Sequence, residues 1–104
     1  MGVHRITSEA AKYYAMRERI LGSGITLLGI ASEKINEIDK GTAEKLGDLA
    51  SHLLPHSPGY AGKLMAVTAR LFWAVAGVEE KEWEFKELDD IEKEIEELKS
   101  KVET

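Results

Sequence analysis

The longest apolar stripe in the sequence lies between Ser57 and Val78. Its members recur at the 3.6-residue period of a helix, and they are Tyr60, Leu64, Val67, Leu71, Val75 and Val78. Further apolar residues lie on the flanking faces, so only a narrow strip is polar. Ser57 and Pro58 suit the N-cap and the first position of a helix. We therefore predict a largely enclosed helix over residues 60–78 at the centre of the core.

A second stretch with helical periodicity covers residues 8–39. Gly22 and Gly24 interrupt it, and each glycine costs about 1 kcal/mol relative to alanine inside a helix. The apolar pattern nevertheless continues in phase across both glycines. One long helix and two helices that meet at a kink both fit this pattern, and we favour the single helix. Gly41 is expected to follow its end as a left-handed C-cap residue.

A third helix is expected between Thr42, which would cap it, and Pro55, which would end it. Its apolar face consists of Ala43, Leu46, Leu49, Ala50, Leu53 and Leu54. Residues 55–59 contain two prolines and a glycine, a composition that suits a tight turn. We expect this turn to join two antiparallel helices as a hairpin.

The C-terminal segment has the most regular pattern. Five apolar residues fall at alternating spacings of three and four, as the a and d positions of a heptad do: Leu88, Ile91, Ile95, Leu98 and Val102. Before them, Trp83 and Phe85 alternate with charge. Because no partner strand exists elsewhere in the sequence, we interpret residues 78–87 as helix or extended linker. The sequence thus predicts an all-α protein, a four- or five-helix bundle. It is a single domain with a core over 1–78 and an acidic, coiled-coil-like helix over 79–104.

The heptad stripe could be buried in two ways. In an antiparallel pair of these helices, Glu94 would meet Lys101 and Glu92 would meet Lys99, so the flanking pairs attract. Alternatively, the helix folds back onto its own bundle, because fewer than three heptads make a weak zipper. We favour a homo-oligomer or a helical protein partner bound through the five apolar residues.

Composition narrows the chemistry that the chain can support. None of the 104 residues is a cysteine, which excludes disulfides, thiolate nucleophiles and thiolate metal sites. A charged fraction of 32%, with one asparagine and no glutamine, is typical of hyperthermophile proteins. The N-terminus lacks a signal-peptide pattern, and the central run of about 14 apolar residues is too short to cross a bilayer. We expect a cytoplasmic protein without a membrane span.

The charge distribution suggests an alternative function. Residues 1–21 carry four basic and two acidic residues, whereas residues 79–104 carry five lysines and twelve acids, so the two ends should attract. Arg5, Lys12 and Arg19 recur every seven residues and could follow the phosphates of a nucleic acid along one helix face. The net charge of −5 argues against this role, so nucleic acid is the less favoured partner.

His52 and His56 have the spacing that places two imidazoles on one helix face for a metal. Pro55 lies between them and ends the helix, and a structural zinc site needs four ligands, for which His4 is the remaining histidine. The sequence shows no phosphate-binding loop, no activated nucleophile and no Glu-x-x-His pair. We therefore expect no metal, no cofactor and no catalytic residue. The leading hypothesis is a small non-enzymatic helical interaction or assembly module that acts through its C-terminal helix.

Overall fold

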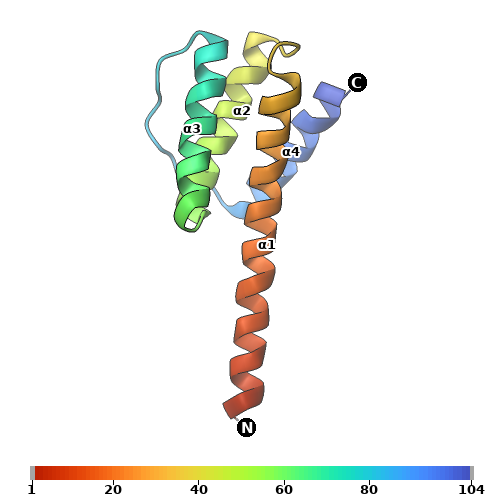
Figure 1. Cartoon of the computed structure of the whole chain (residues 1–104), viewed down its shortest axis with the longest axis vertical. Coiled ribbons are helices and arrows are strands. Elements are labelled where there is room, and N and C mark those ends of the chain that lie inside the picture. The colour runs from red at the N-terminus through yellow and green to blue at the C-terminus, as the bar shows by residue number, and fades with distance from the viewer. Residues whose placement is uncertain (1, 104) are drawn as a thin grey trace.

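A computed structural model describes the backbone of residues 2–103 and the side chains from residue 8 onward (Figure 1). Its elements are α1 (Gly2–Lys34), α2 (Lys40–Leu53), the short 3-10 helix η1 (Leu54–His56), α3 (Gly59–Ala76) and α4 (Leu88–Glu103). No strand occurs among the described residues, so the prediction of an all-α protein is confirmed. The described residues form four α-helices, the lower of the two numbers that we predicted.

The first helix is continuous through Gly22 and Gly24, as we predicted. A Cβ atom at Gly24 would lie 3.4 Å from the Met65 side chain, so this glycine lets α3 pack closely against α1. α1 ends at Lys34, whereas the predicted helix extended to residue 39. The start of α2 also differs from the prediction, because α2 begins at Lys40. Asp39 caps α2, because its carboxylate accepts from the backbone N–H of Thr42 at 3.1 Å. The hydrogen bonds that Asp39 accepts from the hydroxyl and from the backbone N–H of Thr42 lower the pKa of Asp39.

Three cap predictions were therefore wrong. Thr42 lies inside α2 and donates its hydroxyl to Asp39 at 2.6 Å, and Gly41 is a helical residue with no positive φ. Gly77 instead ends α3 in the left-handed conformation, at a φ of 74°. Ser57 does not cap α3, because its hydroxyl donates to the carbonyl of Leu53.

The core is centred on α2, which contacts each of the other three helices. Its apolar face is almost completely buried and comprises Ala43, Leu46, Leu49, Ala50 and Leu53. Ile20, Leu27 and Ile30 of α1 and Met65, Phe72 and Trp73 of α3 pack in the same cluster. We call α2, α3, α4 and residues 20–34 of α1 the body.

The predicted orientation of α3 was wrong. Tyr60 and Val67, which we expected in the core, are 81% and 61% exposed. The buried residues of α3 are instead Gly62, Met65, Thr68, Ala69, Phe72, Trp73 and Ala76. Small residues dominate this side, so α2 can approach closely and two large aromatic rings fill the remaining space.

Trp73 and Gly47 make the tightest contact between α2 and α3. A Cβ atom at Gly47 would lie 2.6 Å from the indole nitrogen of Trp73, so only a glycine fits at this position of α2. The same indole N–H donates to Asp48 at 3.0 Å. Lys81, beyond the end of α3, binds Glu44 at 2.6 Å and Asp48 at 2.9 Å. These bonds raise the pKa of Lys81.

Residues 78–87 form an extended linker between α3 and α4, one of the two interpretations that the sequence allowed. His52 Nδ1 lies 2.9 Å from the carbonyl of Glu84, and His56 Nε2 lies 2.7 Å from that of Lys86. The two histidines therefore fasten the linker to α2 and η1. Among the described residues, no three side chains of the metal-binding types cluster together.

We expect His52→Ala to lower the free energy of unfolding by about 1–2 kcal/mol, since it removes a buried ring and its hydrogen bond to the linker. The exposed Lys45 on the same helix supplies the control, and Lys45→Ala should change stability by less than about 0.5 kcal/mol. Urea denaturation followed by circular dichroism measures both. Equal effects of the two substitutions would show that the linker is not held at His52.

α4 packs its apolar stripe against α1 and α2. Leu88, Ile91 and Ile95 are buried in the common core, and Leu98 and Val102 are partly buried against it. A single chain thus adopts the fold-back alternative, and the five residues that we expected at an oligomer contact already have partners. Both α1 and α2 contact α4, so the stripe is buried within the chain itself.

Candidate interaction surface

The N-terminal part of α1 extends beyond the other helices (Figure 1). Its described side chains from residue 11 to Arg19 are all exposed, and burial begins at Ile20. We call residues 2–19 the projecting half of α1. At a rise of 1.5 Å per residue this segment is about 27 Å long. Over residues 11–19 the described side chains are exposed, so this part of α1 leaves the body as a single helix.

Large exposed apolar side chains are concentrated on two helices. Eight of the ten that the described structure contains lie on α1 and α3, and these are Tyr13, Tyr14, Met16, Ile25, Tyr60, Leu64, Val67 and Leu71. The rings of Tyr13 and Tyr14 pack edge to face, with centroids 5.6 Å apart. Tyr14 and Ile25 are three turns apart and so lie on one side of α1. The exposed apolar surface therefore continues from the projecting half onto the body.

A shallow apolar groove runs between α1 and α3. It is lined by Leu21, Gly24, Ile25 and Leu28 from α1 and by Ala61 and Leu64 from α3, among others. Tyr60, Val67 and Leu71 extend it across the outer side of α3. We call the groove and these three residues the α1–α3 face. The lining of the groove is almost entirely carbon, so the groove can bury another apolar surface.

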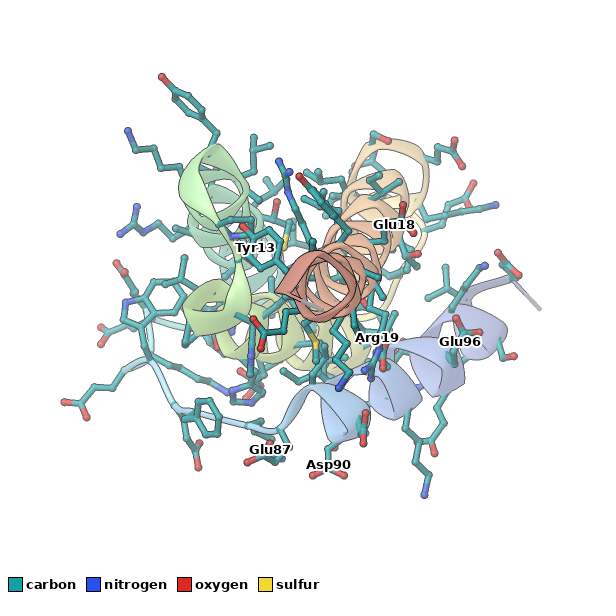
Figure 2. All side chains as sticks on the ribbon, turned by 90° about the horizontal axis from the view of Figure 1, so that it is seen from below. Tyr13, Glu18, Arg19, Glu87, Asp90 and Glu96 are labelled. Atoms are coloured by element: carbon teal, nitrogen blue, oxygen red, sulfur yellow. The ribbon has the colours of Figure 1, made fainter. Side chains whose placement is uncertain are left out.

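Arg19, one of the three cations proposed for nucleic acid, is paired within the chain. Its guanidinium donates to Glu92 and to Asp89 of α4, at 3.2 Å from Nε and 2.5 Å from Nη2 respectively. These bonds, the one to Glu92 first, raise the pKa of Arg19 further. Figure 2 shows Arg19 on the side of α1 toward α4, with Tyr13 on another side. The predicted attraction between the basic and acidic ends thus occurs inside one chain.

The three cations do not form an available stripe. Lys12 is exposed on the projecting half, whereas the side chain of Arg5 lies outside the described residues. Arg19 marks the point where α1 leaves the body, and its ion pairs hold α4 against α1 there. Of the two cations whose side chains are described, the geometry therefore offers Lys12 to a phosphate and Arg19 to α4.

The apolar residues of α3 that line the α1–α3 face were recognised as a stripe in the sequence, but we wrongly assigned this stripe to the core. The stripe from Tyr60 to Leu71 is real, but α3 is apolar around most of its circumference. α1, α2 and η1 pack against it, and one apolar side stays outside. None of the described helices has both the length and the hydropathy to cross a membrane.

The chain has a close relative of known sequence. An uncharacterized protein of Archaeoglobus fulgidus is 65% identical over 102 residues, which are 98% of this chain and 94% of that protein. The chain belongs to the family of this archaeal protein. Because the match covers nearly every residue, the family shares the segments that form the projecting half and the α1–α3 face. No family model matches the chain, and no solved structure does.

Proposed function

We propose that this protein is a small non-enzymatic helical interaction module that binds another protein through its α1–α3 face. The observation that supports this most strongly is the exposure of Ile25, Leu64, Val67 and Leu71 around one apolar groove. Monomeric proteins rarely expose a continuous apolar patch unless it binds something. Covering such a surface removes it from water, at about 25 cal/mol per Å² of apolar area.

The projecting half of α1 supports the same proposal. An isolated helix of its length is marginal in water, because most helical stability in proteins comes from tertiary packing of one face. A partner on the α1–α3 face would supply that packing to the exposed Tyr13, Tyr14 and Met16. The projecting half therefore belongs to the binding surface.

Nucleic acid remains the alternative partner, with less support. Arg19 is neutralised by two carboxylates, and the whole chain carries a net charge of −5. A nucleic-acid site would need several free cations along one face, because phosphate contacts supply most of the affinity. The apolar lining of the groove provides none.

Site-specific photo-cross-linking tests the proposal. Val67 and Phe85 are both 61% exposed, but Val67 lies on the α1–α3 face and Phe85 on the linker. Each is replaced in turn by benzoylphenylalanine in the full chain, which is irradiated alone and in an extract of its source organism. We expect a protein adduct from position 67 that is stronger than from position 85 and is lost in the Leu64→Glu variant.

Mass spectrometry of the adduct identifies the bound protein. A second copy of the chain or a different protein would each support an interaction module. No protein adduct at position 67, or equal adducts from both positions, would contradict it. A nucleic-acid adduct that disappears at high salt would favour the alternative.

A further inference from the structure

We propose that the occupant of the α1–α3 face is a second copy of this chain, whose projecting half lies antiparallel in the groove. This inference rests on the proposed function and names its partner. Two features of one molecule support it. The projecting half of α1 has exposed apolar side chains, and the groove between α1 and α3 has no other described helix packed in it. Because both lie on the same continuous apolar surface, one two-fold operation brings each to the other.

The two features match in length. The projecting half has 18 residues and α3 also has 18 residues, so each is about 27 Å long. The groove itself ends near Leu28 and Met65, and a projecting helix laid along it would continue over Val67 and Leu71 of α3.

The position of Arg19 sets the register. α1 leaves the body at this residue, so a two-fold axis here pairs residues 2–19 of one copy with the body half of the other α1. Tyr13 and Ile25 are each six positions from Arg19 and come level across the axis. Tyrosine suits such a contact because its ring is apolar and its hydroxyl can stay in water. Tyr13 and Tyr14 would then lie over the apolar rim of the partner's groove.

The resulting contact reaches the size of a specific interface. Each copy contributes one helix surface and one groove surface of roughly 27 by 10 Å, so the four surfaces together exceed about 1,000 Å². The acidic helix α4 lies on another side of α1, where Arg19 binds it (Figure 2). The pairing thus keeps the two acidic helices away from the contact.

Light scattering of the full chain provides the first test. We expect twice the chain mass of 11.6 kDa at tens of micromolar protein. Ile25→Lys, at a groove residue that is 68% exposed, should give a folded monomer, and Val67→Lys should do the same. Phe85→Lys, at a linker residue that is 61% exposed, should remain a dimer. Circular dichroism confirms that each variant is folded.

Disulfide trapping tests the antiparallel register, since the chain has no cysteine of its own. Mixing a Tyr13→Cys variant with an Ile25→Cys variant under mild oxidation should give a cross-linked pair. Mixing Tyr13→Cys with Phe85→Cys should give much less. Equal yields from the two mixtures would overturn the register that we propose.

Other outcomes distinguish a failure of this inference from a failure of the proposed function on which it rests. A monomeric wild type would overturn the second copy, while a protein adduct at position 67 would still support an interaction module. A dimer that both lysine variants leave intact would overturn the second copy at this face. A monomeric chain that floats with anionic lipid vesicles, and that Ile25→Lys releases, would replace the second copy with a membrane surface.

Discussion

Phe72→Ala is expected to lower the free energy of unfolding by about 3–5 kcal/mol, whereas Leu71→Ala should lower it by less than about 1 kcal/mol. Phe72 is completely buried between α3 and α2, so its loss removes a large apolar surface and leaves a cavity. Leu71 is its neighbour in sequence but lies about 100° around the helix from it and is 44% exposed. The pair therefore reports directly which side of α3 faces the core.

Urea denaturation followed by circular dichroism measures this difference. The measurement is made in the Ile25→Lys background, so that association through the α1–α3 face does not add to the stability of either variant. Similar losses for Phe72→Ala and Leu71→Ala would show that α3 is rotated relative to the structure described above. A larger loss for Leu71→Ala would restore the orientation that its apolar period first suggested.

Gly47→Ala is expected to destabilise the protein by about 1–3 kcal/mol, although alanine is a better helix former than glycine. The added methyl group would overlap the indole ring of Trp73. Either the ring must withdraw and break its hydrogen bond to Asp48, or α2 and α3 must separate. Both responses disturb the closest helix contact in the body.

Gly29→Ala is the matched control for this substitution. Gly29 lies within α1, and a Cβ atom there would meet nothing within 4 Å. We expect it to leave stability unchanged or raise it by up to about 1 kcal/mol, as helix propensity predicts. Thermal unfolding and tryptophan fluorescence distinguish the two variants. A stabilising effect at Gly47 would show that Trp73 does not occupy the space against this glycine.

Helix number and type could be predicted from the sequence because periodicity is a local property. Pro55 ended α2 as expected, and the continuity of apolar phase across Gly22 and Gly24 indicated one long helix. The extended linker was one of two stated interpretations. For the helices, the deciding interactions lie within a few residues of one another along the chain.

The rotation of α3 about its own axis, which decides which of its sides faces the core, could not be predicted in the same way. Both of its sides are apolar, and the choice between them depends on Gly47, a residue of another helix that makes room for Trp73. Likewise, the roles of His52 and His56 depend on carbonyls about 30 residues away. The interaction surface was missed because a stripe on one helix does not show how many neighbours are present to cover it.

The continuity of α1 makes the projecting half a lever arm with its fulcrum at Arg19. The described helix has no break between its tip and the body, so the packing of Leu27 and Ile30 in the core fixes where the tip points. A tilt of about 5° in the packed half would displace the end of a 27 Å arm by roughly 2 Å. Substitutions deep in the body can therefore misdirect a contact that lies far outside it.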